Sequence, residues 1–457
     1  MGELTGKQKL IWVLGGVLVL AVIVGVLTGA IFQRNEKKDV RLTVWGVFDE
    51  SIIWDSMFSG FHSPAGYNVT FAYRKVPFDD YEGELLNAFA NQTPPDIFMI
   101  HNSWLPKYQD KAAAMPVGQQ WMTYRQYEEA FPDAVITDFT RERAAIYGVP
   151  LYLDTLALYY NKDLLNAAGY AQPPASWEAF KEAVARLTIV DVNGMLVRPG
   201  AALGTARNIN RSTDIWGLLL LQTFGKIRPI DPDMRTAQLT YSSREGAEVY
   251  SPGQDALRFY TDFASPVLKE YTWNRSQPYS IDAFVSGQVA MMLNYSHHIE
   301  TIRARAPELN FGVSRAPQTQ ALLDQQKAVD YPSYFGLAVS RFSTNQQQAA
   351  AWEFLSYLAE PRQQQQYSQL TKRPPAHRQI IATQLEHPDY RVFAQQALTA
   401  KSWYQPNATL METYFADMIE SVIDGVSIRE AVERANGQVS VLLRREDDVV
   451  KPEQGIF

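Results

Sequence analysis

Residues 96–104 have the sequence DIFMIHNSW, and they decide the fold class of this chain. The first five form a short apolar run that predicts a buried strand, and HNSW then predicts a polar loop with one aromatic ring. Upstream, residues 81–90 and 52–61 have the apolar spacing of helices, and residues 67–73 and 41–45 read as strands. Strand, helix, strand, helix, strand is typical of a parallel sheet, in which ligands bind beyond the carboxyl ends of the strands.

The same alternation continues downstream. Residues 153–160 (LDTLALYY) predict a strand that contains one acid, Asp154, and residues 161–165 (NKDLL) begin a helix. Ser176 is the expected N-cap of a further helix, because it directly precedes WEAF and follows two prolines. From residue 345 onward the pattern is mostly helical. The whole chain therefore reads as α/β.

Composition bounds the function. A chain of 457 residues exceeds one typical core, so two lobes are expected. Its net charge of −7 disfavours nucleic acid as a partner. Cysteine is absent, which excludes disulfides, thiolate metal ligands, a cysteine nucleophile and lipid attachment through an N-terminal cysteine.

The amino terminus carries a predicted membrane anchor. Residues 10–32 are apolar and uncharged over a length that spans a bilayer core of roughly 30 Å. We expect residues 1–9 to form a cytoplasmic tail and residues 33–40 a tether to the first strand. The alternative is a signal peptide cleaved near residues 28–30 (TGA). Both alternatives export the rest of the chain.

Enzyme motifs are missing from the sequence. The six histidines form no HExxH motif, and there is no GxSxG elbow and no GxxxxGK[ST] loop. Adjacent acids such as Asp79 and Asp80 are typical of a solvated turn rather than a glycosidase pair. We therefore predict no enzymatic activity, no cofactor and no metal site.

Four segments, in this order, resemble the family-1 extracellular solute-binding proteins, which include maltose-binding protein. They are TPPDIF at 93–98; GVP at 148–150 followed by LALYYNKDLL at 156–165; DAFVSGQVAMM at 282–292; and the helical tail with VIDG at 422–425. The resemblance spans nearly all of the chain after residue 40. It implies a two-lobe periplasmic-binding-protein type II fold (a Venus flytrap), here with an N-terminal transmembrane helix.

The resemblance also implies how the lobes divide the sequence. Lobe 1 would take residues 41–150 and 335–375, and lobe 2 would take 153–333 and 376–457. The crossings would fall near 150–154, 331–336 and 373–377. Lobe closure would surround a ligand with polar groups and flat aromatic faces, an arrangement that suits sugars.

Family contact positions carry over onto loops of this sequence. The ligand-binding residues they imply are Phe48, Asp49, Glu50, Asn102, Ser103, Trp104, Asp154, Arg211, Thr213, Tyr295, Ser296, His297, Tyr334, Trp403 and Tyr414. Helix capping remains an alternative role for Asp49 and Glu50, a hinge hydrogen bond for Asp154, and a solvated loop for Arg211. Maltose-type members carry a stacking Trp where this chain has His297, which argues against malto-oligosaccharides.

The expected function is capture of a small polar ligand, a carbohydrate by this resemblance, for an ABC importer with a separate permease and ATPase. The protein would sit outside the cytoplasm as a single-pass membrane protein. The alternatives are a membrane-tethered sensor or scavenging receptor without a transporter, a cell-surface glycosidase and an adhesion protein. Replacing Trp104 or Asp154 by Ala is expected to weaken binding and leave the fold intact.

Overall fold

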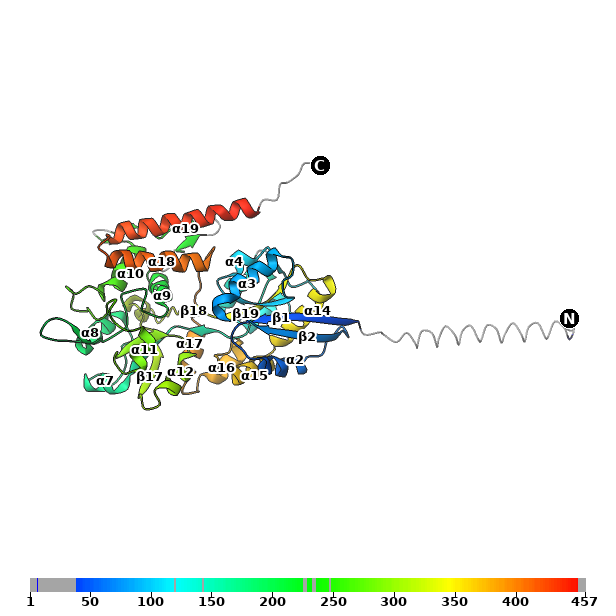
Figure 1. Ribbon diagram of the computed structural model, residues 1–457, viewed down its shortest axis with the longest axis horizontal. Coiled ribbons are helices and arrows are strands. Elements are labelled where there is room, and N and C mark those ends of the chain that lie inside the picture. Colours follow the sequence, from blue (N-terminus) through cyan, green and yellow to red (C-terminus); the bar gives the residue numbers. More distant parts are fainter. Residues whose placement is uncertain are drawn as a thin grey trace.

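A computed structural model describes Gly6 and residues 38–118, 121–141, 144–224, 228–231, 236–245 and 248–450. These residues form two lobes, with the blue and yellow elements of Figure 1 in one and the green elements in the other. Each lobe has its own apolar core. The predicted cytoplasmic tail and anchor, residues 1–32, lie outside the described residues apart from Gly6. No helix in the described part of the chain is long and apolar enough to span a membrane.

Lobe 1 is built on a mixed sheet in the order β2-β1-β3-β19-β4, with β7 also paired to β19. β1 is parallel to both β2 and β3, and β19 runs antiparallel to β3. The bounds are β1 Asp39–Gly46, β2 Asn68–Lys75, β3 Ile97–His101, β4 Ala112–Ala113, β7 Val149–Pro150 and β19 Phe335–Ser340. The strands expected at 41–45, 67–73 and 96–100 are confirmed. β1 begins at Asp39, so the predicted tether is two residues too long.

Helices cover both faces of this sheet. They are α2 (Ser51–Ser59), α3 (Phe78–Ala90), α4 (Leu105–Tyr108), α5 (Tyr124–Ala130), α6 (Asp133–Phe139), α14 (Asn345–Leu358), α15 (Pro361–Thr371) and α16 (Arg378–Gln384). A short hairpin, β5 (Thr140–Arg141) with β6 (Ala145–Ile146), follows α6.

Lobe 2 is centred on β9 (Ala157–Asn161), which pairs antiparallel with β16 (Met291–Asn294) and β17 (Phe311–Arg315). Ser176 caps α8 as expected, because its hydroxyl accepts a hydrogen bond from the Ala179 amide at 3.1 Å. The helices are α7 (Lys162–Ala167), α8 (Trp177–Leu187), α9 (Ser212–Phe224), α10 (Pro252–Asp262), α11 (Ser280–Val285), α12 (His298–Arg305), α13 (Gln320–Asp324), α18 (Ala408–Ile423) and α19 (Ile428–Val450). Three hairpins complete the lobe: β10 (Ile189–Val190) with β11 (Leu196–Arg198), β12 (Ile230–Asp231) with β13 (Thr236–Ala237), and β14 (Ser243–Glu245) with β15 (Glu248–Tyr250).

Two crossing segments between the lobes pair with each other. β8 (Asp154–Thr155) lies antiparallel to β18 (Pro332–Ser333), with Ser333 opposite Asp154. The chain crosses a third time between α17 (Arg391–Ala397) and α18. At that point Ser402 bonds to Asp138 of lobe 1, and Trp403 packs on the lobe 2 core.

Residues 376–400 pack mainly on lobe 1. The sequence instead predicts that lobe 2 resumes at residue 376 and that the third crossing falls at 373–377. Ala376, Ile381, Ala394 and Ala400 all belong to the lobe 1 core. Phe393 of this stretch belongs to the lobe 2 core instead, and Tyr390 and Val392 pack against that core. Helical periodicity identifies an apolar face but does not say which core that face joins, so the sequence misplaced this segment.

Candidate functional site: an interlobe cleft

A cleft of about 670 Å³ lies between the two lobes. Lobe 1 contributes Phe48, Phe78, Asp79, Glu82, His101, Asn102, Ser103 and Trp104. The segments at or next to the first two crossings contribute Tyr152, Asp154, Tyr331, Pro332, Ser333 and Phe335, and Arg373 follows α15. Lobe 2, with the start of its tail, contributes Arg211, Thr213, Asp214, Tyr295, His297, Thr301, Trp403, Gln405, Ala408, Thr409, Glu412 and Phe415. Aromatic rings and charged groups therefore share one concave site of ligand size.

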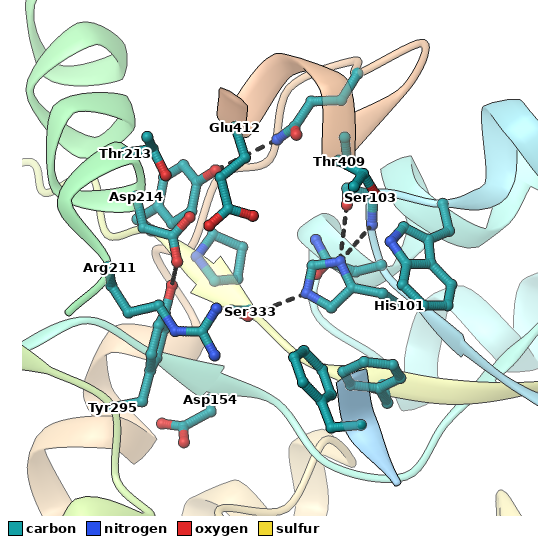
Figure 2. A pocket seen from close by; sticks show the side chains of 18 of the residues that line it. His101, Ser103, Asp154, Arg211, Thr213, Asp214, Tyr295, Ser333, Thr409 and Glu412 are labelled. Carbon is teal, nitrogen blue, oxygen red and sulfur yellow. Dashed lines mark hydrogen bonds between the residues drawn. The ribbon is translucent and has the colours of Figure 1, made fainter. Parts of the chain in front are cut away.

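The lobe 1 wall is formed by the carboxyl end of β3. His101 ends this strand, and its Nδ1 lies 2.7 Å from Ser103 Oγ while its Nε2 lies 3.0 Å from Ser333 Oγ on the crossing strand β18 (Figure 2). Trp104 stands beside it, with its ring edge-on to Phe335 at 5.7 Å between centroids. The loop of residues 101–104 thus brings a neutral hydrogen-bonding ring and a flat aromatic face to the cleft.

Burial lowers the pKa of His101 to about 3, and the positive charge of Arg211 across the cleft adds to this effect. An unfolded chain would protonate the same ring near its ordinary pKa of about 6.5. The imidazole therefore stays neutral in the folded protein, so one ring nitrogen donates a hydrogen bond and the other accepts one.

Acidification is expected to destabilise the protein through His101. Because the pKa of His101 is lower in the folded state, the unfolded state binds more protons below pH 6.5. The free energy of unfolding therefore decreases as the pH falls from about 6.5 toward 3. At pH 5 the loss from this one ring is about 2 kcal/mol relative to pH 7. Denaturant unfolding of the protein and of His101→Asn at both pH values checks this. Equal losses in the two proteins would contradict it.

The lobe 2 wall carries a charged cluster at the start of α9. Arg211 takes a left-handed conformation, with φ of 62°, directly before the helix, and its guanidinium points into the cleft (Figure 2). Tyr295 Oη donates a 2.8 Å hydrogen bond to Asp214 Oδ2, and the Arg211 guanidinium lies 5.9 Å from the Tyr295 ring centroid. Burial raises the pKa of Asp214, and the nearby Arg211 opposes that shift. A strained backbone at a cleft residue is a common feature of ligand sites.

Asp154 acts as a hinge acceptor. Its carboxylate accepts hydrogen bonds from Ser296 Oγ at 2.6 Å, from the Ser296 amide at 3.0 Å and from the Thr155 amide at 2.8 Å. His297 Nδ1 lies 3.9 Å away on the cleft side. Asp154 therefore lines the cleft, but most of its bonding capacity is used within the protein.

A polar contact bridges the lobes at the cleft. Thr409 on α18 donates a hydrogen bond of 2.7 Å to Glu82 Oε2 on α3, and Lys107 Nζ lies 2.7 Å from the other oxygen of Glu82. This contact joins the tail of lobe 2 to lobe 1.

The structure brings ten of the fifteen predicted site residues to the cleft: Phe48, Asn102, Ser103, Trp104, Asp154, Arg211, Thr213, Tyr295, His297 and Trp403. The other five do not line it. Asp49 is buried behind Phe48, where it binds Arg373 and Tyr367. Glu50 pairs with Lys75 at the surface, and its side chain makes no capping hydrogen bond to α2.

Three more predicted residues lie beside the cleft rather than in its lining. Ser296 donates to Asp154, and Tyr334 is buried with its hydroxyl on Asp138 at 2.7 Å. Tyr414 packs partly against the lobe 2 core, one position from the cleft residue Phe415. Predicting ligand contacts from their positions in loops identifies the segments that border the cleft. A shift of one residue along a strand or helix, however, turns a side chain to another face.

Several lining residues were not predicted as contacts. Asp214 and Glu412 belong to predicted helices, and Tyr331 and Arg373 belong to segments next to expected crossings. The i, i+4, i+7 spacing of Ala408, Glu412 and Phe415 marks one helical face and could have identified the α18 contribution.

Two α/β lobes that enclose a ligand-sized cleft and are joined by three crossings define a two-lobe ligand-binding protein. Residues 61–390 match the bacterial extracellular solute-binding protein family, and the chain belongs to this family. The resemblance seen in the sequence is thereby confirmed. Within the described residues, no group of three or more His, Cys, Asp or Glu side chains could hold a metal ion.

Solved structures share the fold. The cyclic α-maltosyl-1,6-maltose binding protein of Arthrobacter globiformis is similar with a TM-score of 0.71 at 22% identity, covering 89% of this chain and 100% of that one. The sugar-binding protein MalE of Xanthomonas citri gives 0.68 at 20% identity, covering 91% and 100%. UgpB of Mycobacterium tuberculosis, solved with glycerophosphocholine, gives 0.69 at 16% identity, covering 89% and 99%.

Among curated proteins, a binding protein of Brucella abortus (strain 2308) is 24% identical over 251 residues, which are 54% of this chain and 56% of that protein. This chain thus spans about half the length of the curated relatives it matches. The family and these relatives are binding proteins rather than enzymes.

Proposed function

We propose that this protein captures a carbohydrate in the interlobe cleft and delivers it to the permease of an ABC importer. Family membership supports solute capture outside the cytoplasm. Two of the structurally similar proteins bind sugars, and this also supports a carbohydrate ligand. The permease, a separate ATPase and a retained N-terminal anchor at residues 10–32 complete the proposal.

The combination of flat rings and hydrogen-bonding charges in one cleft carries this proposal. Trp104 from lobe 1 and Trp403 from the third crossing supply aromatic faces, which pack on the apolar C–H faces of sugar rings. Arg211 and Glu412 supply a donor and an acceptor for hydroxyl groups. The eleven other predicted contacts that line the cleft or lie beside it, and Glu50 at the surface, remain part of the proposal as expectations.

A thermal-shift screen tests the function. The full chain in mild detergent is heated with mono- and oligosaccharides, polyamines, amino acids and phosphodiesters. A ligand at about 100 times its Kd adds roughly 2.7 kcal/mol of stability and raises the melting temperature. A hit among the sugars supports the proposal. A hit only among the polyamines, amino acids or phosphodiesters would keep the binding function and replace carbohydrate as the proposed ligand. Silence throughout would contradict small-solute capture.

The bridge from Thr409 to Glu82 is expected to favour the closed arrangement of the lobes. Thr409→Val removes the donor but keeps the side-chain shape. It should therefore raise the Kd of a sugar hit about three- to tenfold, the effect of one hydrogen bond. Isothermal titration calorimetry measures this.

Thr413→Val is the matched control. Thr413 lies one turn further along α18 and, among the residues that the structure describes, donates only to the Thr409 carbonyl of its own helix. An equal loss of affinity in both variants would show that the effect comes from α18 itself rather than from the contact between the lobes.

A further inference from the structure

One face of α18 forms part of the cleft. Ala408, Glu412 and Phe415 follow the i, i+4, i+7 spacing of a helix face, and all three line the cleft. The Glu412 carboxylate points from this face toward the Arg211 guanidinium (Figure 2). Glu412 therefore places a carboxylate opposite the cluster at the start of α9.

Arg211 and Glu412 have unused hydrogen-bonding capacity. Asp214 already accepts the Tyr295 hydroxyl. Arg211 Nε is buried and has no hydrogen-bond partner among the described residues. The Glu412 carboxylate likewise accepts no hydrogen bond within the described ranges, although it interacts electrostatically with both Arg211 and Asp214. A buried donor without a partner costs free energy, so a ligand that satisfies it gains affinity.

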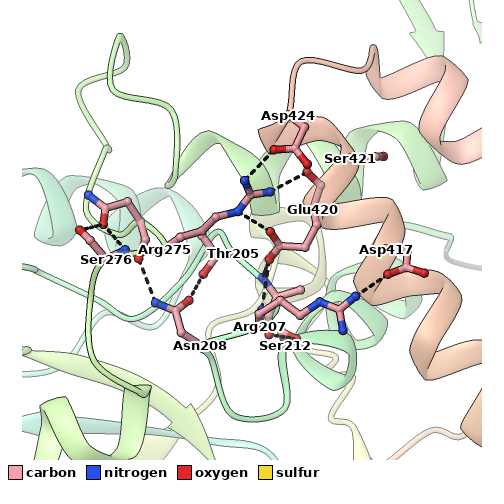
Figure 3. A network of polar contacts seen from close by, with 12 residues as sticks. Thr205, Arg207, Asn208, Ser212, Arg275, Ser276, Asp417, Glu420, Ser421 and Asp424 are labelled. Atoms are coloured by element: carbon pink, nitrogen blue, oxygen red, sulfur yellow. Dashed lines mark hydrogen bonds and ion pairs between the residues drawn. The ribbon is translucent and has the colours of Figure 1, made fainter.

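A second network fixes the position of this face. The Glu420 carboxylate, two turns further along α18, accepts the backbone amides of Ala206 and Arg207 at 2.7 and 3.1 Å (Figure 3). Arg275 Nε binds the other oxygen of Glu420 at 2.6 Å. The helix that carries Glu412 is thus tied to the loop that leads into Arg211. This tie reduces the ordering that ligand binding requires.

The charges of the cluster limit what can bind between these residues. Arg211 is one cation facing two carboxylates, Asp214 and Glu412. A carboxylate or phosphate on the ligand would bring a third negative charge into this group, and like charges at a binding site are disfavoured. A hydroxyl group, in contrast, can donate to Glu412 and accept from Arg211 without adding charge.

We propose that Arg211 and Glu412 form a hydroxyl-binding subsite, and that Glu412 makes the cleft selective for uncharged sugars over sugar acids. This inference rests on the proposed function and deepens it. Glu412 is the specificity-determining residue, because it supplies the negative charge that an acidic ligand would meet.

Glu412→Gln tests the inference, because it removes the charge and keeps the shape. The probes are gluco-, galacto- and manno-oligosaccharides, each in a neutral form and in a form with a terminal uronate, and calorimetry measures their Kd values. The full chain should bind a neutral sugar about tenfold or more tightly than its uronate counterpart, and Glu412→Gln should narrow that ratio to about threefold or less.

Asp417→Asn is the control for net charge. Asp417 lies on α18 outside the cleft lining and pairs at the surface with Arg207, and its substitution removes the same single negative charge. It should leave the neutral-to-uronate ratio unchanged.

The remaining outcomes each decide against the inference in a recognisable way. An unchanged ratio of uronate to neutral-sugar Kd in Glu412→Gln, or an equal change of that ratio in Asp417→Asn, would overturn the role of Glu412. Tighter binding of the uronate, or of an amino-sugar analogue, by the unmodified protein would overturn the selection for uncharged sugars. A failure of every saccharide to bind would remove the proposed function itself, and this result is distinguishable from the others.

Discussion

Asp49→Ala is expected to lower the free energy of unfolding by about 3–5 kcal/mol, because it leaves a buried arginine without its counter-ion. Arg373 Nη1 lies 2.6 Å from Asp49 Oδ1, and the Tyr367 hydroxyl donates to Asp49 Oδ2 at 2.6 Å. The side chain of Arg373 is only 16% exposed and that of Asp49 only 2%. Water therefore cannot replace the lost partner. Denaturant titration of the protein and the variant measures the change.

The same substitution should weaken ligand binding. The Arg373 guanidinium lies 5.1 Å from the ring centroid of Phe48 and 5.0 Å from that of Tyr152, and both rings line the cleft. Asp49 thus acts on the cleft through Arg373, whereas the sequence had placed it in direct contact with the ligand.

Two further variants make the assignment specific. Asp49→Ala combined with Arg373→Met removes both charges, and it should recover at least about half of the lost stability. Glu50→Ala breaks the neighbouring ion pair, in which the side chain of Glu50 is 71% exposed and that of Lys75 is 39% exposed. It should change the free energy of unfolding by less than about 1 kcal/mol. A double variant no more stable than Asp49→Ala would refute the unpaired charge as the cause.

Asp154→Ala is the second substitution with a large expected effect, a loss of about 3 kcal/mol. It removes the acceptor of three hydrogen bonds and leaves the buried amides of Thr155 and Ser296 unsatisfied. The expectation from sequence, weaker binding with the fold intact, is therefore replaced by a combined loss of stability and affinity. Thermal unfolding with and without a sugar hit separates the two losses.

Matched substitutions set the scale for Asp154. Asp154→Asn keeps one side-chain oxygen as an acceptor and should lose less stability than Asp154→Ala. The side chain of Asp133 is 93% exposed and pairs with Arg378. Asp133→Ala should therefore change the free energy of unfolding by less than about 0.5 kcal/mol. A similar loss in Asp133→Ala and Asp154→Ala would count against the hinge role.

The sequence by itself determined the α/β class, most of the long elements and the segments that face the cleft. Its period-2 and period-3.6 patterns report which side of an element is apolar, and this signal is local. The loop at 101–104 follows from the same logic, because β3 runs parallel to β1 and its carboxyl end delivers the polar residues to the ligand edge of the sheet.

Only the tertiary structure decided which core each helix joins and which polar groups meet. Residues 376–400 pack mainly on lobe 1, and the third crossing falls after them, because α16 and one face of α17 join the lobe 1 core. Asp49 and Arg373, which are 324 residues apart, meet only in the folded chain. Glu412 faces Arg211 for the same reason (Figure 2). Periodicity along a chain does not encode these distant pairings, which arise when two lobes and their crossing segments pack against one another.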